Sequence, residues 1–343
     1  MSGSVPLVEA QGVGHRYRTA GGGWFRRTEA PRVLRDVSIR IDRGEIVGLI
    51  GESGSGKSTL GRILANLQRQ TEGTVLIEGT DVATLRGEQA RVARRRAQVI
   101  FQNPYSSVNR RFTIRQVLAD PLRVNGLDDR DRWEERSREL LERVGVPVSV
   151  LDRYPHQLSG GQLQRVCVAR TLILDPAFVV ADEPTASLDM TSAAQVVDLL
   201  AETSRDLGLG LLFISHDLSV VARLADRIAV MYQGSIVEEG PTQQILVQPS
   251  HPYTRALRAA VPSADPSRRR TERIQVEPDA QGVEIEQGCR FVTRCPLRVD
   301  VCSSVTPALS TRDDGRRVAC HRIGPDGSQV ETPHIEPEER SRA

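Results

Sequence analysis

The sequence has few aromatic residues, no long apolar run and almost no net charge. Aromatic residues make up 4% of the 343, and no stretch approaches the roughly 20 consecutive apolar residues that a membrane-spanning helix needs. The opening residues, MSGSVPLVEA, lack the charged and then apolar regions of a secretion signal. With 46 basic and 44 acidic residues, the net charge of +2 gives no overall attraction to nucleic acid or to an anionic membrane surface. We therefore expect a cytoplasmic protein whose partners are recognised locally.

The composition that is present is that of a globular protein. Hydrophobic residues make up 39% of the chain and charged residues 26%. These proportions exclude collagen, a coiled coil and an intrinsically disordered chain. At about 150 residues per domain, the length corresponds to about two domains, or to one large domain with an appendage.

Lys57 is the only lysine in the chain, and the other 45 basic residues are arginine. It lies in GESGSGKS (residues 51–58), which matches the phosphate-loop pattern G-x-x-x-x-G-K-[ST]. An apolar run at 46–50 precedes the pattern, and leucine and isoleucine follow it at helical spacing. The sequence therefore predicts a strand at 46–50, a glycine loop, and a helix over 59–67.

Each part of such a loop can bind nucleotide phosphates. Backbone N–H groups and the positive end of the following helix attract phosphate oxygens, Lys57 reaches the β and γ phosphates, and Ser58 ligates Mg²⁺. A site that needs an ammonium group and cannot use a guanidinium fork explains why this one position is lysine. The alternative is a glycine-rich turn that matches by chance, and the strand, the helix and the solitary lysine favour the nucleotide site.

A second acidic element follows a buried strand. Residues 177–181 are apolar and lead into Asp182 and Glu183. Because sites of α/β proteins lie at strand ends, we expect Asp182 to hold Mg²⁺ through water and Glu183 to polarise the water that attacks the γ phosphate. The alternative is that these carboxylates cap the next helix.

A third element is a second glycine-rich anion site. The sequence LSGGQ at 158–162 begins an apolar helix about one hundred residues after the first loop. One nucleotide does not need two such sites. From residue 8 to about 240 the chain resembles the ATP-binding subunits of ABC transporters, in which LSGGQ completes the ATP site of the other subunit of a head-to-tail dimer. The resemblance implies an α/β fold: an ABC-type phosphate-loop ATPase with a mixed-sheet core and a helical subdomain.

The resemblance also assigns roles to single residues. Tyr17 matches the aromatic residue that stacks on adenine, and Gln102 the glutamine that senses the γ phosphate and ligates Mg²⁺. His216, after an apolar strand, matches the histidine that contacts the γ phosphate. A lone histidine at a strand end is more often structural, and its place after the acidic and LSGGQ motifs favours the catalytic role. Residues 187–189 match the loop that signals across the dimer.

These assignments define one predicted site. The catalytic residues are Lys57, Gln102, Glu183 and His216, and the Mg²⁺ ligands are Ser58, Gln102 and Asp182. The nucleotide-binding residues are Tyr17, Gly51, Ser53, Gly54, Ser55, Gly56, Lys57, Ser58, Thr59, Gln102 and Asp182, with Ser159, Gly160, Gly161 and Gln162 facing the partner's nucleotide.

Composition and motifs divide the chain into regions. We expect the ABC nucleotide-binding domain at 1–240, with its helical subdomain at about 103–170 and the permease-coupling surface near 102–123. The glycine-rich segment 20–27 is typical of a surface loop. The charged stretch 85–97 fits a solvated helix face better than a nucleic-acid contact, because acidic neighbours dilute its arginines. HPYT at 251–254 resembles the start of the C-terminal region of oligopeptide and dipeptide importer ATPases, which we place at 241–323. We expect a disordered tail at 324–343.

Four of the five cysteines gather in 32 residues of the C-terminal region, and the fifth, Cys167, is expected in the core. A segment with few large apolar side chains cannot form a core alone, and a reducing cytosol disfavours disulfides, so a four-thiolate metal site is the expected staple. No pair has the two-to-four-residue spacing usual for zinc, which favours a [4Fe–4S] cluster over zinc. The resemblance supports the cluster; free cysteines, or a partial site with His321, are the alternative. The four residues are Cys289, Cys295, Cys302 and Cys320.

The resemblance implies an ATP-hydrolysing subunit that powers peptide import from the cytoplasmic face of the membrane. Its implied partners are a second, related ATPase, two transmembrane permeases and an extracytoplasmic solute-binding protein, with no nucleic acid. The alternative is a soluble ABC ATPase that acts on DNA or ribosomes. The single nucleotide domain, the near-neutral charge and the HPYT segment disfavour it.

Overall fold

The structure is a computed structural model of the chain, and it describes residues 5–17, 31–127, 130–260, 285, 287–324 and 326. The expected surface loop at 20–27 and nearly all of the expected tail lie outside these residues. Within them, no helix has both the length and the apolar character needed to cross a membrane.

The chain divides into two compact units. The first comprises residues 1–236 and 241–243, and the second residues 237–240 and 244–343. The division passes through the strand β10 (Ser235–Pro241) and the start of the helix α9 (Thr242–Val247). The domain limits expected from the sequence remain predictions.

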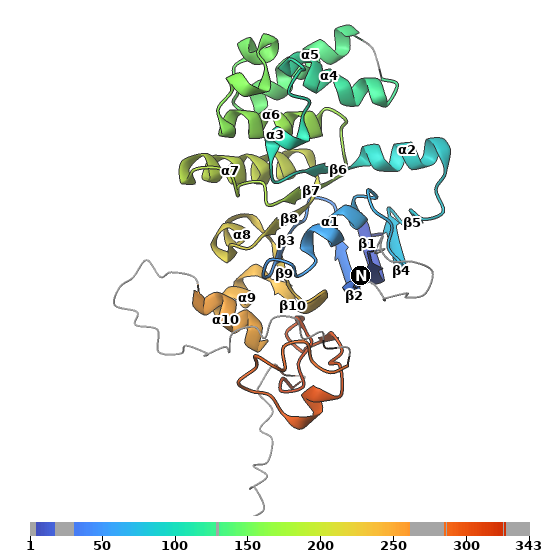
Figure 1. Cartoon of the computed structure of the whole chain (residues 1–343), viewed down its shortest axis with the longest axis vertical. Coiled ribbons are helices and arrows are strands. Elements are labelled where there is room, and N and C mark those ends of the chain that lie inside the picture. The colour runs from blue at the N-terminus through green and yellow to red at the C-terminus, as the bar shows by residue number, and fades with distance from the viewer. Residues whose placement is uncertain are drawn as a thin grey trace, which may run out of the picture. The chain divides into compact units, whose positions relative to one another are not determined.

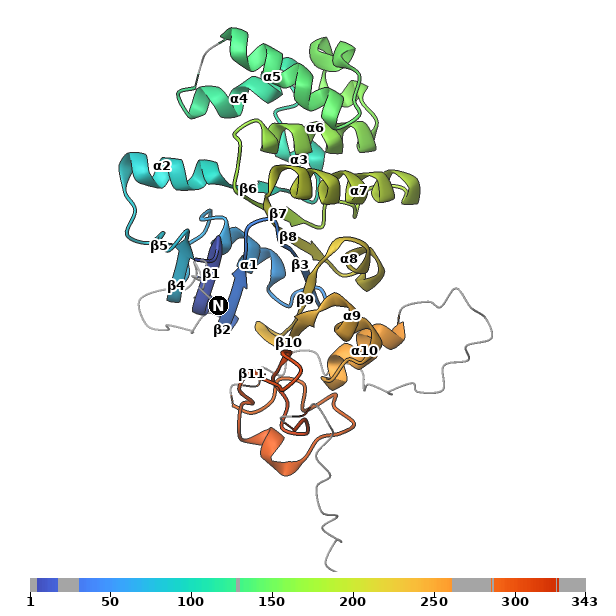
Figure 2. The same cartoon turned by 180° about the vertical axis from the view of Figure 1, so that it is seen from behind.

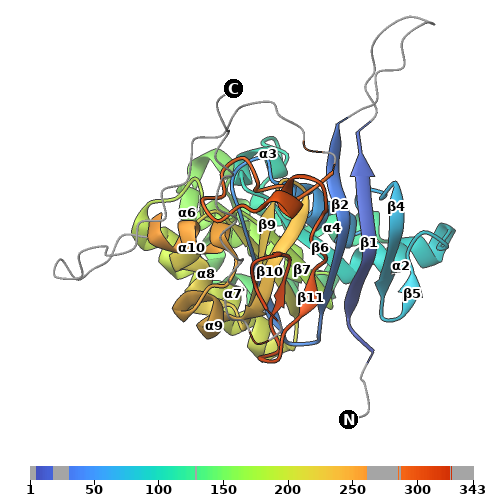
Figure 3. The same ribbon diagram turned by 90° about the horizontal axis from the view of Figure 1, so that it is seen from below.

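One sheet of the first unit is antiparallel. Its strands lie in the order β2-β1-β4-β5, and Figure 3 shows β2, β1 and β4 side by side. Along β2, buried Val37, Ile39 and Ile41 alternate with more exposed residues, as expected for a sheet with one face on the core. The strands are β1 (Val8–Arg16), β2 (Arg32–Ile41), β4 (Glu72–Ile77) and β5 (Thr80–Asp81).

The second sheet of this unit is built on parallel strands. They follow the order β9-β3-β8-β7-β6, so their carboxyl ends meet at one edge. All residues of β3, β7 and β8 are buried, which explains why these strands are continuous apolar runs rather than alternating patterns. The strands are β3 (Ile46–Ile50), β6 (Ala97–Ile100), β7 (Phe178–Asp182), β8 (Gly210–Ser215) and β9 (Arg227–Tyr232).

Helices cover these sheets in two groups. The helix α1 contacts strands of both sheets and lies between them (Figure 1). The helix α6 contacts α3, α4, α5, α7 and β6, and Figure 2 shows α3 to α6 grouped together. The helices are α1 (Lys57–Leu64), α2 (Gly87–Arg96), α3 (Pro104–Ser107), α4 (Ile114–Val124), α5 (Arg130–Arg143), α6 (Gly160–Leu172), α7 (Met190–Leu207) and α8 (Leu218–Leu224), with 3₁₀ turns η1 (Val148–Asp152) and η2 (Pro155–Gln157).

The helix after the phosphate loop starts and ends earlier than the expected 59–67. Gly56, at φ 100°, caps α1 in a left-handed conformation, so helical geometry already begins at Lys57. At the other end Asn66 is left-handed, with φ 55°, and this conformation stops the helix. The charged stretch that was expected to be a solvated helix face is α2, of which only Ala93 is buried.

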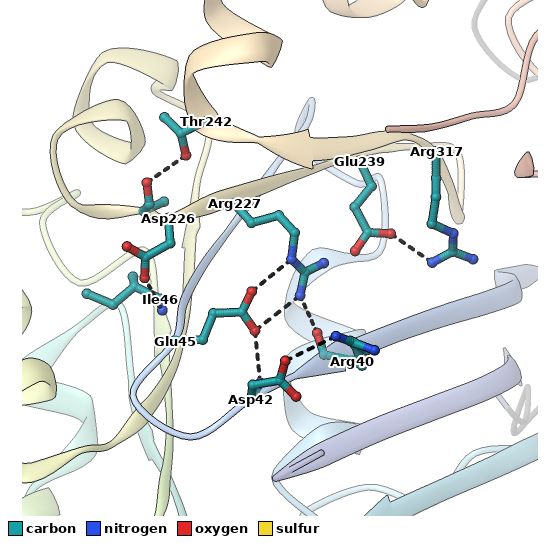
Figure 4. Close-up of polar contacts among 10 residues, drawn as sticks. Arg40, Asp42, Glu45, Ile46, Asp226, Arg227, Glu239, Thr242 and Arg317 are labelled. Carbon is teal, nitrogen blue, oxygen red and sulfur yellow. Dashed lines mark hydrogen bonds and ion pairs between the residues drawn. The ribbon is translucent and has the colours of Figure 1, made fainter. Parts of the chain in front are cut away.

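A polar network holds the start of β3, whose far end carries the phosphate loop. Arg227 pairs with Glu45 at 2.8 Å, and the Asp226 carboxylate accepts from the backbone N–H of Ile46 at 2.9 Å (Figure 4). The Thr242 hydroxyl donates to the carbonyl of Ala225 at 2.6 Å. These bonds satisfy polar groups around the buried strand and fix its position.

The second unit is mostly irregular and is organised around buried Glu238. Its carboxylate accepts from the backbone N–H groups of Ser250 at 2.7 Å and His251 at 2.9 Å, just before α10, and lies 3.7 Å from Arg316. The ring of Phe291 lies within 6 Å of the rings of His251 and Tyr253. The HPYT segment therefore packs on the chain that carries the cysteines. The remaining elements are α10 (Pro252–Ala260), η3 (Asp300–Ser303), β11 (Ser310–Thr311) and β12 (Arg317–Val318).

Candidate active site

The phosphate loop connects the carboxyl end of β3 to α1 and folds around Lys57. The side chain is 5% exposed, and its Nζ donates to the carbonyls of Gly51 at 2.8 Å and Glu52 at 2.7 Å. Burial lowers the pKa of Lys57, while the nearby carboxylates of Glu183, Asp182 and Glu52 raise it. The loop therefore holds an ammonium group within the field of the acidic strand end.

Two glycines of the loop have no room for a side chain. A Cβ on Gly51 would lie 2.1 Å from the carbonyl oxygen of Met231, and one on Gly56 would lie 2.9 Å from that of Val33. Such close approach of backbone to backbone requires glycine at both positions.

Ser58 and Asp182 lie side by side. The Ser58 hydroxyl donates to Asp182 Oδ1 at 2.8 Å, and Asp182 is 7% exposed. Burial raises the pKa of Asp182, and the Ser58 hydrogen bond and the charge of Arg62 lower it. A buried carboxylate beside a serine hydroxyl provides the hard oxygen ligands that Mg²⁺ prefers, so the residues present fit the ion.

Glu183 lies between two of the other predicted catalytic residues, Gln102 and His216. Its Oε2 accepts from Gln102 Nε2 at 3.4 Å and lies 3.5 Å from His216 Nδ1. Its backbone has φ 46°, an uncommon value for a residue with a side chain. Strain of this kind persists only where the surroundings enforce it, and the N–H of Glu183 is held by the carbonyl of Ile214 at 3.0 Å.

Tyr17, the predicted adenine-stacking residue, lies beside the phosphate loop. Its hydroxyl is 3.0 Å from Thr59 Oγ1, and the buried ring of His15 meets it edge-on at 4.9 Å. The ring of Tyr17 is 42% exposed, so one side is available to a ligand.

The LSGGQ segment makes its own helix cap. Ser159 begins α6, accepts from the N–H of Gln162 at 3.2 Å, and donates its own N–H to the Gln162 side chain at 3.2 Å. A Cβ on Gly161 would lie 2.9 Å from Ser192 Oγ in the first turn of α7, which explains glycine there. Asp189 caps α7, and its bonds to backbone N–H groups lower its pKa.

The structure thus brings some predicted residues together and leaves others apart. Lys57, Ser58, Asp182, Glu183, Gln102 and His216 form one connected group at the sheet edge. Ser159 and Gln162 instead form hydrogen bonds with each other, near the first turn of α7. Within the part of the chain that the structure describes, no hydrogen bond joins the LSGGQ segment to this group.

Sequence reasoning missed two residues, one of which acts on this group. Arg62 influences Asp182, and its position four residues after Ser58, on the same face of α1, could have revealed it. Gln164 in α6 is fully buried, and no pattern in a single sequence marks a glutamine as a core residue.

The four clustered cysteines lie in the second unit, and all four are buried or partly buried. Cys289 and Cys302 are buried, and the Cys289 N–H donates to the carbonyl of Cys302 at 2.7 Å. Burial raises the pKa of Cys289 to about 12 and that of Cys295 to about 11, with smaller contributions from the other thiols. Burial also raises the pKa of Cys320.

No three His, Cys, Asp or Glu side chains among the described residues form a group that could hold a metal ion. The expected metal site is therefore without support from the geometry. His321, the alternative ligand, has its Nε2 2.9 Å from the carbonyl of Val305. The fifth cysteine, Cys167, is 5% exposed and lies in the core.

The fold and the site define an ATP-binding cassette. Residues 34–186 match the ABC transporter family model, and residues 237–302 match the model of the oligopeptide/dipeptide transporter C-terminal region. A solved structure of a dimeric ATP-binding cassette bound to ADP and phosphate superposes with a TM-score of 0.61 at 28% identity, and covers 69% of this chain and 99% of that one. The expected ABC ATPase fold is confirmed.

Close relatives narrow the family. A protein of Brucella ovis is 43% identical over 319 residues, which are 93% of this chain and 98% of that protein. The dipeptide transport ATP-binding protein DppF of Haemophilus influenzae is 40% identical over 93% of this chain and 98% of its own length. The Escherichia coli DppF is 39% identical over 94% and 96%. The chain belongs to the ABC transporter ATPases, in the oligopeptide and dipeptide transporter branch.

Proposed function

We propose that this ABC ATPase powers the import of peptides through a membrane transporter. The observation that carries the hydrolytic part is the Glu183 carboxylate, held between Gln102 and His216 beside the Ser58–Asp182 pair. The similarity to dipeptide transport proteins over nearly the whole chain supports the peptide part. The soluble alternative is not favoured by either comparison.

The geometry supports hydrolysis by an activated water. Glu183 accepts a hydrogen bond from the water and draws away its proton as the water oxygen bonds to the γ phosphorus. The bond to the β–γ bridging oxygen breaks, and ADP and phosphate result. Lys57 and the loop N–H groups stabilise the charge on the phosphate oxygens, and His216 orients Glu183. Mg²⁺, held by Ser58, Asp182 and Gln102, supplies further charge neutralisation when bound.

Replacement of the proposed base tests this mechanism. Glu183→Gln keeps the shape and removes the carboxylate, so we expect ATP binding to persist while hydrolysis and transport are lost. Bound nucleotide is identified by chromatography after Mg-ATP incubation. Transport by cells that carry only the Gln variant would refute the role of Glu183.

We further propose that a second ATPase completes the site. The chain has one phosphate loop and one LSGGQ, and each composite site needs both. A cavity of about 420 Å³ beside Glu183 and His216 opens next to Met190, whose side chain is 89% exposed. An exposed methionine at this place fits burial by another ATPase subunit. By family resemblance we take that subunit to be a related, non-identical chain.

The permeases are proposed to dock near residues 102–123, which places the chain on the cytoplasmic face of the membrane. Directly before and after this region, exposed apolar side chains include Phe101, Val124 and Leu127. A cavity of about 540 Å³ lies alongside, and its lining includes Leu122, Leu127 and Trp133 among charged side chains. Apolar anchors with charged surroundings suit a protein helix. A solute-binding protein would reach the complex through the permeases.

Affinity purification of the tagged chain from native membranes tests the assignment to a transporter. The tagged chain is extracted from native membranes in mild detergent, and copurifying proteins are identified by mass spectrometry. We expect two multi-span permeases and a second ATPase. Recovery from the soluble fraction alone, or with nucleic acid or ribosomes, would overturn the transport assignment and leave the ATPase site intact.

We also propose that Cys289, Cys295, Cys302 and Cys320 hold a [4Fe–4S] cluster. The four cysteines lie within 32 residues of the sequence, and the backbone N–H of Cys289 donates to the carbonyl of Cys302 at 2.7 Å, which supports the proposal. A single tetrahedral zinc would draw sulfurs to within about 4 Å of one another, given a Zn–S length of about 2.3 Å. A cubane accepts four thiolates from irregular loops, and no pair of these cysteines has the two-to-four-residue spacing usual for zinc.

Metal analysis of anaerobically purified protein tests the cluster. We expect about four irons per chain for a [4Fe–4S] cluster, together with broad visible absorption that Cys302→Ser diminishes. Cys167→Ser is the matched control, because Cys167 lies in the core of the first unit. About one zinc per chain with no iron would overturn the cluster.

A further inference from the structure

The helix α6, which begins with the LSGGQ segment, contains a buried polar side chain whose carboxamide is unpaired. Gln164 is 0% exposed, and neither its Nε2 nor its Oε1 has a hydrogen-bond partner among the described residues. Buried amides are nearly always paired, because their loss of water is otherwise uncompensated. An apolar residue would fit this position at lower cost, so the amide needs an explanation.

The neighbours along the helix show which way Gln164 faces. One turn earlier, a Cβ on Gly160 would lie 3.6 Å from Leu188, in the loop after β7. One turn later, Val168 lines a small cavity with Ile100 and Val179, which belong to β6 and β7. Residues four apart share a helix face. Gln164 therefore lies on the face that packs against β6, β7 and the loop after β7.

A second neighbour points to the same place. Cys167, three residues after Gln164, has its Sγ 4.0 Å from the carbonyl of Pro104, just beyond the loop that carries Gln102. The two loops that meet this helix face are therefore those that bear Gln102 and Glu183. These side chains bond each other at 3.4 Å.

We propose that Gln164 is a positioning residue: in the arrangement that hydrolyses ATP, its carboxamide hydrogen-bonds the backbone of the loops that carry Gln102 and Glu183. The bond links the LSGGQ helix to the catalytic carboxylate. Because it forms in that arrangement and not in the one described here, it favours the hydrolytic arrangement. The unpaired amide is then the cost of a contact that another state of the cycle makes. The inference rests on ATP hydrolysis and is independent of the transported solute.

The test replaces the amide by an apolar side chain of similar size. In the detergent-extracted complex, Gln164→Leu should lower kcat about tenfold, the effect of losing one hydrogen bond in the reacting state. The KM for ATP should stay within about twofold, because Gln164 does not touch the nucleotide. The melting temperature should be unchanged or higher, because an unsatisfied buried group has been removed. Gln164→Met is the second variant.

Thr171→Val is the matched control on the same helix. Its hydroxyl is buried and donates to the carbonyl of Cys167 at 2.9 Å, so its loss perturbs α6 without changing the proposed contact. We expect this variant to lose stability and keep kcat.

Three outcomes would overturn the role of Gln164. Both Gln164 variants could retain the wild-type kcat, or both could melt lower or fail to fold, which would show that the amide is already paired in the resting protein. Alternatively, Thr171→Val could reduce kcat as much, which would make the effect one of helix stability. The wild-type complex is measured in parallel. If the proposed function is wrong, the wild-type complex itself has no transport-coupled ATPase activity, whereas a wrong role for Gln164 leaves the wild-type activity intact.

Discussion

Single residues of the active site are held in states that burial alone disfavours. Lys57 is charged in a buried loop, and Asp182 is a buried carboxylate whose pKa is raised. Each lowers the cost of the other, since Asp182 raises the pKa of Lys57 and Lys57 lowers that of Asp182. Bound Mg-ATP supplies the charges that complete the site. The arrangement of Lys57 and Asp182 therefore favours ligand binding at the expense of the free energy of unfolding.

Lys57→Arg tests whether position 57 needs an ammonium. The loop closes around the compact Nζ with bonds of 2.7 and 2.8 Å to two carbonyls, and a planar guanidinium cannot repeat this geometry. We expect ATPase activity to fall by at least about 100-fold, as when a preorganised donor is lost. ATP hydrolysis is measured by phosphate release. Arg62→Lys, on the same helix, is the conservative control, and equal losses in both variants would contradict a special role for position 57.

Asp182→Asn tests whether the Asp182 carboxylate lowers the stability of the fold and is needed for hydrolysis. The folded pKa of Asp182 is raised above its unfolded value of 3.8, so its ionised form costs stability once the pH rises above 3.8. At neutral pH the Asn variant should therefore melt at a higher temperature than wild type without ligand. It should lose Mg²⁺-dependent hydrolysis. Differential scanning calorimetry with and without Mg-ATP measures both effects, and a variant that melts lower in the absence of ligand would contradict the assignment of burial as the main cause.

At the scale of elements, the strands and helices that carry motifs were predictable, and the tertiary contacts of the motifs were not. The strand at 46–50 and the apolar run before Asp182 follow directly from their apolar character, because only fully buried parallel strands dispense with alternation. The limits of α1 were shifted because Gly56 and Asn66 adopt left-handed backbone, which depends on local packing. Likewise, the pairing of Glu183 with both Gln102 and His216 joins three distant segments, which resemblance to a family suggests and spacing alone does not.

The HPYT segment was recognised by resemblance, and the structure gives it a physical role. Two of its partners were invisible in the sequence: Glu238 lies in β10, and Phe291 lies among the cysteines. The backbone N–H groups of Ser250 and His251, just before α10, need an acceptor, and the buried Glu238 carboxylate supplies it. A glutamate in a strand pattern would ordinarily be expected to face solvent.

His251 should make α10 sensitive to acid. Burial, with a smaller contribution from the charge of Arg255, lowers its pKa from 6.5 to about 3. Because the folded pKa is depressed, neutral His251 contributes full stability above pH 6.5, and this contribution is lost as the pH falls toward 3. The slope is at most about 1.4 kcal/mol per pH unit for one proton. Hydrogen exchange of α10 amides, corrected for intrinsic rates, measures it.

His251→Asn is the matched variant for this prediction. The asparagine Oδ1 can replace Nδ1 as acceptor for the N–H of Tyr253, which lies at 3.1 Å, and cannot titrate. We expect a flatter pH dependence between about 4 and about 6.5 than in wild type. Glu238 acts in the opposite sense, because burial raises its pKa, and its contribution is present in both proteins and cancels in the comparison. Equal slopes in the two proteins would contradict the assignment.

At the scale of the whole molecule, the arrangement that we propose gives this chain half of each of two composite sites. Lys57, Ser58 and Glu183 stand in one connected group, and Ser159 with Gln162 caps a separate helix. A complete site thus depends on which chain supplies the facing LSGGQ segment. If the partner is a related and different ATPase, two copies of this chain do not form an active pair.

Mixing two inactive variants decides between these pairings. Lys57→Ala removes the phosphate-loop charge, and Ser159→Arg blocks the LSGGQ face, so neither variant alone should hydrolyse ATP. In a dimer of identical chains, a mixed pair would regain one intact site, formed by Lys57 of the Ser159→Arg chain and Ser159 of the Lys57→Ala chain. Because we propose a non-identical partner, we expect no recovery on mixing the purified chains. Recovery comes instead when either variant is replaced by wild type in the complex extracted from native membranes. A substantial return of activity on mixing, close to the quarter expected for random pairing of independent sites, would show that the chain pairs with itself.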